Sequence, residues 1–390
     1  SMDFNFTEEQ QLIQESAREF ATKIIAPLAG QIDAEDKIPV EILDGMGELG
    51  FMGMPFPVKY GGSALGYEYY VLVQEQIARA SAGVATLFSV HMLGADAIAI
   101  FGTEEQKDRY FPDICTGKLH PSFAFTEPET GSDPKQLVTT VTQDGDYAVI
   151  NGVKRFISAA TYEGPIVVFC KDAEVGGVSA YIVDKLCPGY SLSPAWEKIG
   201  GHGSPIYDVY LKDVRVPTSN LLGQRGKGFD ILLLGIAFGK IGTSTIALGS
   251  ILAAYEDAVK YAKEKLHRGQ PIAKFQAIQL KVGHLAAKYH STRWMCYRLG
   301  TLANDILSKR STDWGQFEAE AALVKGYASD TAVEAAKLSM DVHASYGLTK
   351  DFAIERVYRD TIICPQIEGV SDMQRIIFDL ELTPNRGDLS

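Results

Sequence analysis

One carboxylate near the C-terminus has the setting of a group that removes a proton from carbon. Glu368 follows the stretch 362–367 (Ile-Ile-Cys-Pro-Gln-Ile) and directly precedes Gly369. A carboxylate among such apolar residues is either a helix-starting residue that accepts backbone N–H groups or a desolvated general base. Burial raises the pKa of a carboxyl group toward the working pH, which suits proton abstraction. Glu368 is therefore the first candidate catalytic residue.

A polar loop in the middle of the chain is a candidate ligand-binding segment. Residues 125–133 read Phe-Thr-Glu-Pro-Glu-Thr-Gly-Ser-Asp. These are residue types that surface turns use, so the string is compatible with a turn alone. The alternative is a loop whose backbone amides and hydroxyls contact a polar ligand, with Gly131 permitting close approach of the backbone. The loop sequence by itself leaves both interpretations open.

A third string combines an aromatic side chain with a hydroxyl. Residues 151–158 read Asn-Gly-Val-Lys-Arg-Phe-Ile-Ser, and Asn151-Gly152 predicts a turn before a strand. The two-residue period of a strand would place Phe156 and Ser158 on one face, where they could stack on and hydrogen-bond a flat heterocycle. They could equally be one core residue and one rim residue.

The elements that must position these candidates change in period along the chain. From Thr7 to about Thr116 apolar residues recur at helical spacing, and capping-box sequences at 7–10 and 103–106 mark helix starts. The following hundred residues contain short runs rich in Val, Ile and Tyr, with a hairpin signal at Asp144-Gly145, which together predict strands.

Long helical patterns return after Gly228, over 229–266, 272–307 and 317–346, and predict an antiparallel bundle. The charged residues of 355–360 predict a solvated ion-pair network on a further helix. We therefore expect an α+β multidomain protein with an N-terminal α-helical domain (1–116), a central β-barrel or sandwich domain (117–226) and a C-terminal four-helix bundle (227–390).

Composition narrows the function classes. The formal charge of −12 and pI near 5.1 argue against nucleic acid or anionic lipid as the main partner. Five scattered cysteines without C-x-x-C spacing indicate free thiols in a reducing compartment and no zinc site. We see no secretory signal and no run long enough for a membrane span. We therefore expect a cytoplasmic protein, or a mitochondrial matrix protein if a transit peptide has been removed.

In this order and at these spacings, the three strings resemble the acyl-CoA dehydrogenase family over essentially the whole chain. The resemblance implies that family's fold and a bound flavin adenine dinucleotide (FAD). It implies that Phe156, in the place of a tryptophan, stacks near the flavin and that Ser158, in the place of a threonine, faces its reactive nitrogen. The other flavin contacts that it implies in this region are Phe123, Phe125, Thr126, Gly131 and Ser132.

The resemblance also assigns the catalytic base to Glu368. A smaller subgroup of the family carries the base on the first bundle helix, and the matching position here is Gly239, which has no carboxylate. The substrate contacts that the resemblance implies are Ser132, Lys240, Ile367 and Gly369.

A further set of implied cofactor contacts would hold the adenosine diphosphate part of FAD across a dimer interface. The set consists of Lys265, Arg268, Asp341, Val370 and Asp372. Lys265 stands where the family has an arginine, and Arg268 could supply the missing guanidinium. Asp341 and Asp372 replace glutamines, and an ionised aspartate cannot donate a hydrogen bond. We therefore expect FAD to dissociate more readily than in a typical relative.

The implied reaction is α,β-dehydrogenation of an acyl-CoA thioester to the trans-2-enoyl thioester by a homotetramer that passes electrons to an electron-transfer flavoprotein. Ala85 matches the position of an arginine in relatives that act on glutaryl thioesters, so we expect a monocarboxylic substrate. The alternatives are a thioester on a carrier protein, a flavin oxidase or monooxygenase on the same fold, and a non-catalytic paralogue.

Overall fold

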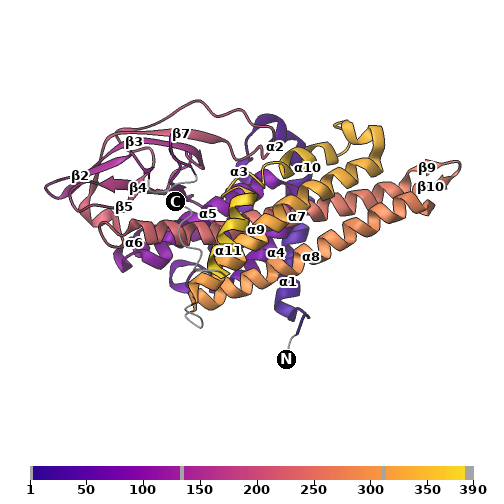
Figure 1. The fold of residues 1–390 in the computed structure, drawn as a ribbon, viewed down its shortest axis with the longest axis horizontal. Helices are drawn as coiled ribbons and strands as arrows, with labels where there is room; N and C mark the ends of the chain where they lie inside the picture. The colour runs from indigo at the N-terminus through magenta and orange to yellow at the C-terminus, as the bar shows by residue number, and fades with distance from the viewer. Residues whose placement is uncertain (1–2, 132–135, 309–312, 383–390) are drawn as a thin grey trace.

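The computed structural model describes residues 3–131, 136–308 and 313–382 (Figure 1). Ser132, predicted to contact both cofactor and substrate, lies outside the described residues. The chain forms a helical N-terminal domain, a central sheet domain and a C-terminal helical domain, as the sequence predicts. The boundaries predicted at 116 and 226 fall in the connections between helical and strand-rich parts.

Two helices of the N-terminal domain, α1 and α6, start at capping boxes that the sequence predicts. The Thr7 hydroxyl accepts from the Gln10 N–H, while the Gln10 side chain accepts from the Thr7 N–H. Thr103 and Gln106 make the same reciprocal pair, so both predicted capping boxes are confirmed. The α-helices are α1 (Glu8–Phe20), α2 (Ala29–Glu35), α3 (Val40–Glu48), α4 (Tyr67–Ala80), α5 (Ala82–Phe101) and α6 (Glu104–Cys115).

The central domain is one hydrogen-bonded sheet in the order β6-β7-β3-β2-β4-β5-β8, with β1 parallel to β4. The strands are β1 (Ser122–Ala124), β2 (Thr140–Asp144), β3 (Tyr147–Ser158), β4 (Pro165–Asp172), β5 (Val178–Asp184), β6 (Tyr190–Leu192), β7 (Ile206–Pro217) and β8 (Leu221–Leu222). Along β4, Ile166 and Val168 enter a core of the sheet's own, whereas Val167 and Phe169 enter the helical core. This alternation joins the sheet to the helices.

Two details of the sheet bear on the predictions. The hairpin at Asp144-Gly145 is confirmed, because Asp144 pairs with Tyr147 across it. The turn predicted at Asn151-Gly152 is wrong: β3 runs through both residues, and the ladder to β7 shifts register between Ile150 and Gly152. The extra residue of this irregularity lies on β7, where Asp213 has a φ of +49°, and a side chain at position 152 would collide with Thr139.

The C-terminal domain consists of long helices packed side by side (Figure 1). These elements are α7 (Gly228–Glu264), the hairpin β9 (Leu266–His267) and β10 (Gln270–Pro271), α8 (Gln276–Leu307), α9 (Trp314–His343), α10 (Ile354–Thr361) and α11 (Ser371–Leu382). By length and composition alone α5 and α7 could each cross a membrane, but their most apolar windows are 67% and 89% buried within the protein. Such burial is expected of core helices in a packed domain.

The charged residues of α10 do not form the solvated network that the sequence predicts. Arg359 does pair with Glu355 on its own helix at 2.8 Å, but it also reaches Asp33 of α2 at 2.7 Å. Asp360 is buried and accepts a hydrogen bond from the Gly201 N–H. These contacts join α10 to α2 and to the connection before β7, and the side chains that make them are partly or fully buried.

Candidate active site

Glu368 lies in the connection between α10 and α11, in a backbone conformation that few residues other than glycine adopt. Its φ is +53° and that of Gly369 is +88°. The connection closes on itself, because the Ser371 N–H donates to the Pro365 carbonyl. Left-handed non-glycine residues are strained and gather at functional sites. Ile367, a predicted substrate contact, is the half-buried residue directly before Glu368.

The Glu368 carboxylate points at bare backbone of α7. A Cβ atom at Gly239 would lie 3.0 Å from Glu368 Oε2 and 3.5 Å from Leu93 of α5. Within the described residues no hydrogen bond to this carboxylate is found, so the helix-starting interpretation of Glu368 is not supported. The absence of a side chain at position 239 creates the space that the carboxylate occupies.

One helical turn away, the same face of α7 contacts Phe123 of β1, which directly precedes the predicted flavin loop (residues 125–133). A Cβ atom at Gly235 would lie 2.8 Å from the Phe123 ring and 3.7 Å from Leu93. Residues 235 and 239 are one turn apart, about 6 Å along the helix, and face the same side. The fold therefore brings Glu368 and Phe123 together, although they are far apart in the sequence.

Two buried lysines flank the carboxylate. Lys240 of α7 was expected here, whereas Lys325 of α9 was not. Burial raises the pKa of Glu368, and the charges of Lys325 and Lys240 oppose this rise. Burial also lowers the pKa of each lysine to about 8. The site is thus a desolvated carboxylate between two cations, an arrangement that can hold and release a proton.

The helical face on which Lys325 lies indicates that this lysine is buried. Its neighbours at helical spacing are Ala321, Ala322, Ala328 and Ser329, and all of them are buried. A lysine in the middle of a small, apolar helix face is not a surface residue, because buried lysines need a specific partner. Reading the helical face, instead of the linear string, would have found it.

The flavin loop is fixed by buried charges and by backbone bonds. Lys154 and Glu127 form a completely buried ion pair at 2.8 Å, and Lys154 also donates to the Phe125 carbonyl. The Arg155 N–H donates to the Thr126 carbonyl at 2.7 Å. Phe125 and Thr126 are consequently held by their backbone atoms, while the Thr126 side chain is half-buried and makes no hydrogen bond among the described residues.

The residues around the predicted flavin loop and the end of β3 fit a flat, polar cofactor. Phe156 is 50% exposed and lies edge-on to Trp196, with ring centroids 5.4 Å apart. Burial alternates through Phe156, Ile157 and Ser158, which agrees with Phe156 and Ser158 sharing a face, although Phe156 has a φ of +59° beside a register shift. Nothing in the described chain lies within 4 Å of the Cβ position of Gly131. An exposed aromatic, an available hydroxyl and open backbone are what a bound flavin requires.

The remaining predicted cofactor contacts separate into two groups. Val370 and Asp372 are exposed beside the Glu368 turn, where Arg375 donates to Asp372 at 3.0 Å. The second group consists of Lys265, Arg268 and Asp341. The Lys265 ammonium group lies 4.8 Å from the centre of the Tyr346 ring, and Arg268 is exposed in the β9–β10 hairpin. Asp341 is exposed and pairs with Lys337 at 2.6 Å, a contact that the sequence had not indicated.

The second group is too far from the flavin loop to share one cofactor within a single chain. From Gly239 to Glu264, α7 spans about 38 Å at 1.5 Å per residue. The β9–β10 hairpin lies at the end of α7 and α8 that is farthest from the sheet (Figure 1). Lys265 and Arg268 can therefore meet FAD only if it is bound mainly by another subunit.

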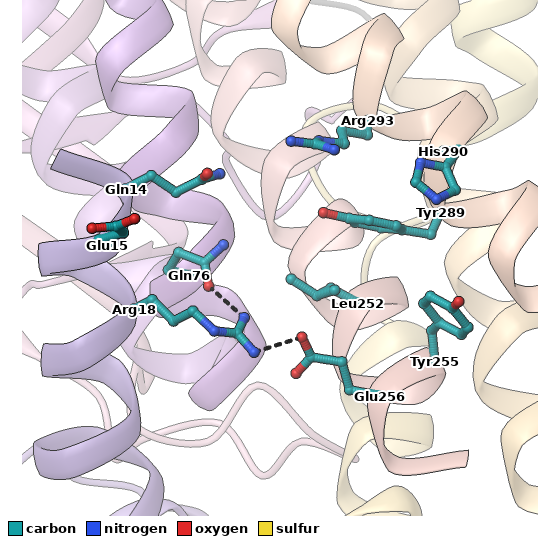
Figure 2. Close-up of a pocket in the computed structure, with 10 residues that line it drawn as sticks. All are labelled: Gln14, Glu15, Arg18, Gln76, Leu252, Tyr255, Glu256, Tyr289, His290 and Arg293. Carbon is teal, nitrogen blue, oxygen red and sulfur yellow. Dashed lines mark hydrogen bonds and ion pairs between the residues drawn. The ribbon is translucent and has the colours of Figure 1, made fainter. Parts of the chain in front are cut away.

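A separate surface pocket of about 330 Å³ lies between α1, α4, α7 and α8 (Figure 2). Arg18 crosses it, donating to Gln76 at 3.2 Å and to Glu256 at 2.7 Å. None of the predicted site residues lines this pocket. Its polar contacts connect the first helix to the bundle, so we assign it to the packing of the two helical domains.

Comparisons with known proteins agree with this architecture. Models of the N-terminal, middle and C-terminal domains of acyl-CoA dehydrogenase match residues 7–118, 122–214 and 226–380. A 3-(aryl)acrylate reductase of Clostridium sporogenes is 36% identical over 95% of this chain and 98% of its own, and an acyl-CoA dehydrogenase of Bacillus subtilis is 36% identical over 95% and 97%. The CarC subunit of the caffeyl-CoA reductase–Etf complex of Acetobacterium woodii is 34% identical over 95% and 97%.

Solved structures give the same result. Butyryl-CoA dehydrogenase from Megasphaera elsdenii superimposes with a TM-score of 0.92 at 31% identity, covering 98% of this chain and all of that one. An acyl-CoA dehydrogenase from Bacillus anthracis in complex with FAD gives 0.91 at 29% identity, covering 98% and 68%. The matched family models, the relatives and the shared fold together show that this chain is a flavin-dependent oxidoreductase that belongs to the acyl-CoA dehydrogenase family.

Proposed function

We propose that this enzyme catalyses α,β-dehydrogenation of a monocarboxylic acyl-CoA, with Glu368 as the base and an electron-transfer flavoprotein as the electron acceptor. The observation that supports this most strongly is the pair of contacts on α7. The Glu368 carboxylate lies against Gly239, one turn from the contact between Gly235 and Phe123, a predicted flavin contact in β1 directly before the flavin loop. A thioester between the carboxylate and the loop would present its α-carbon to the base and its β-carbon to the flavin.

In this reaction the α C–H bond breaks toward Glu368, which takes the proton, and a double bond forms between the α- and β-carbons. Bound FAD supplies the acceptor for the hydride that leaves the β-carbon. The thioester carbonyl needs a hydrogen-bond donor as negative charge develops on its oxygen. The Glu368 N–H fits this role, because it makes no backbone hydrogen bond among the described residues. Both lysines would help to hold the carboxylate ionised before the proton moves.

A monocarboxylic substrate is supported by the surroundings of Ala85. This residue is completely buried on α5, and its carbonyl accepts from the buried Gln74 side chain at 2.7 Å. A distal carboxylate placed there would lose its hydration without gaining a cation, which costs several kcal/mol. Substrates with an apolar acyl end avoid this cost.

A second candidate function is the reverse reaction, the reduction of an enoyl thioester. Two of the relatives are named as reductases, and one of these as a subunit of a complex with Etf. In that candidate function the same site adds a hydride and a proton to an enoyl thioester, with Glu368 as the acid. The residues serve both directions, since a group that accepts a proton in one direction donates it in the other.

We also propose a homotetramer made of two dimers. A distance of about 38 Å along α7 separates Gly239, beside Glu368, from the end of the helix that precedes Lys265 and Arg268, so a cofactor contacted by both groups needs two chains. The predicted low affinity for FAD then depends on the residues of this second group. Arg268 would raise that affinity by bidentate pairing with a phosphate of the cofactor.

The test is anaerobic mixing of the purified holoenzyme with butyryl-CoA and with longer or aryl-substituted acyl-CoAs. We expect loss of flavin absorbance with wild-type protein and loss slower by about 10²–10⁴-fold with Glu368→Gln, which keeps shape and removes basicity. Flavin occupancy should be equal in both proteins. A Glu368→Gln enzyme that reduces its flavin within a few-fold of wild type would exclude Glu368 as the base. Wild-type protein that binds flavin but is reduced by no thioester would favour the non-catalytic paralogue, and rapid reoxidation in air would favour an oxidase.

A further inference from the structure

One buried lysine joins α9 to the turn that carries Glu368. Lys325 is completely buried, and its ammonium group donates a hydrogen bond to the Gly369 carbonyl. A second contact lies five residues further along α9. There the Asp330 carboxylate accepts a hydrogen bond of 2.8 Å from the Ser371 hydroxyl and forms an ion pair with Arg375. Helix α9 therefore holds the end of the Glu368 connection at two points.

The turn needs such support because its conformation is strained. Two consecutive residues, Glu368 and Gly369, have positive φ angles, and a non-glycine residue in that region is strained because its Cβ lies too close to the backbone. A Cβ atom at Gly369 would lie 2.3 Å from the Gln374 side chain, so the turn is also packed closely against α11. The Lys325 bond supports the turn on the side of α9.

The charge of Lys325 acts on the same carboxylate. The charged and titratable groups that influence Lys325 are Cys364 and Glu368 of the connection, Lys240 of α7 and Asp330 of α9. Of the two lysines that favour the ionised form of Glu368, Lys325 has the larger effect. Lys240 makes no hydrogen bond to the turn among the described residues, so it contributes charge without fixing the backbone.

We propose that Lys325 is a positioning residue for the base: it holds the Glu368–Gly369 turn against α9 and keeps the Glu368 carboxylate ionised and directed at the glycine face of α7. This role rests on the proposed function of Glu368. Lys325 is therefore not a catalytic residue, because it acts only through Glu368.

The test compares Lys325→Met, Lys325→Arg and the control Lys288→Met by anaerobic stopped-flow flavin reduction across pH. Lys288 is a lysine of α8 that pairs with Glu334 on the protein surface. Removing the cation raises the pKa of Glu368, so the acid limb of the rate profile should move up by about one pH unit in Lys325→Met. The maximum rate should fall about 10-fold, because the carboxylate is less well directed. Lys325→Arg keeps the donor and the charge and should restore the acid limb, and Lys288→Met should match wild type.

An acid limb in Lys325→Met that coincides with that of wild type would overturn the proposal, since a purely structural role changes stability or flavin occupancy but not this limb. If Lys325→Met does not fold, Lys325→Gln serves instead, because it keeps a donor and removes the charge, and the same limb decides. Glu368→Gln is measured in parallel. An inactive Glu368→Gln with an unshifted Lys325→Met refutes only the positioning role, whereas an active Glu368→Gln refutes the proposed base.

Discussion

A single added methyl group tests whether the glycine face of α7 sets the position of the base. In Gly239→Ala the new Cβ would lie 3.0 Å from Oε2 and 3.3 Å from Cδ of Glu368. Contacts in this range force the neighbouring atoms to move by a few tenths of an ångström. The atoms that must move are those of the carboxylate, because the Leu93 contact of 3.5 Å is an ordinary one.

This substitution should affect stability and rate in different ways. Replacing glycine by alanine inside a helix favours folding by about 1 kcal/mol, and crowding of the carboxylate opposes this by a similar amount, so stability should change little. The rate has no such compensation. A displacement of 1 Å in a reacting group costs ~10²-fold, so a few tenths of an ångström should slow flavin reduction by about 10-fold.

The assay is anaerobic flavin reduction by the best acyl-CoA substrate, with thermal unfolding measured on the same samples. The matched control is Gly283→Ala in α8, where nothing lies within 4 Å of the Cβ position. The control should gain the same helix propensity and keep the wild-type rate. A Gly239→Ala enzyme that reduces its flavin as fast as Gly283→Ala would show that the carboxylate is not positioned by this face, and the geometric basis of the proposed function would fail.

Three further predictions follow from other parts of the chain. FAD should be lost on extensive dialysis, and more of it from Arg268→Ala; full occupancy in both would remove the compensating role of Arg268. Glutaryl-CoA should be a poorer substrate than butyryl-CoA, and equal or higher activity would contradict the argument from Ala85. Burial raises the pKa of Asp360 to about 6, so its contribution to stability is fully present below pH 4 and is lost as pH rises through 6. We therefore expect the free energy of unfolding to fall between pH 4 and pH 7, and to fall less in Asp360→Asn than in wild type. An equal fall in the two proteins would contradict this role of Asp360.

Much of this architecture could be predicted from local sequence signals. Capping boxes at Thr7 and Thr103, and the Asp144-Gly145 turn, act through hydrogen bonds and backbone preferences within a few residues. Glu368 also stands out locally as a candidate, since its apolar neighbours and the following glycine are adjacent in the chain, and its role as the base stays a prediction. Such features can be predicted because the residues that interact are near one another in the sequence.

The features that were missed depend on partners that are distant in the chain. Asn151-Gly152 has the composition of a turn, yet pairing with β7 keeps it inside strand β3. The helix face of Lys325 indicates burial, but its partner, the Gly369 carbonyl 44 residues later, cannot be read from that face. Arg359 likewise finds Asp33 across 326 residues. In each of these cases a tertiary contact decides between two locally acceptable states.

The glycines of α7 show how the sequence builds the site despite a local cost. The helix carries four of them on one face, at Gly235, Gly239, Gly242 and Gly249. Each costs about 1 kcal/mol relative to alanine in a helix interior. Their Cβ positions lie against Phe123, Glu368, Ser89 and Ala78, respectively. The spacings of four, three and seven residues keep these contacts within about 80° of the helix surface at 100° per residue. One glycine face therefore brings Phe123 of β1, the proposed base Glu368 and helices α4 and α5 to a common line. Packing against that face must offset roughly 4 kcal/mol of lost helix propensity for the site to exist.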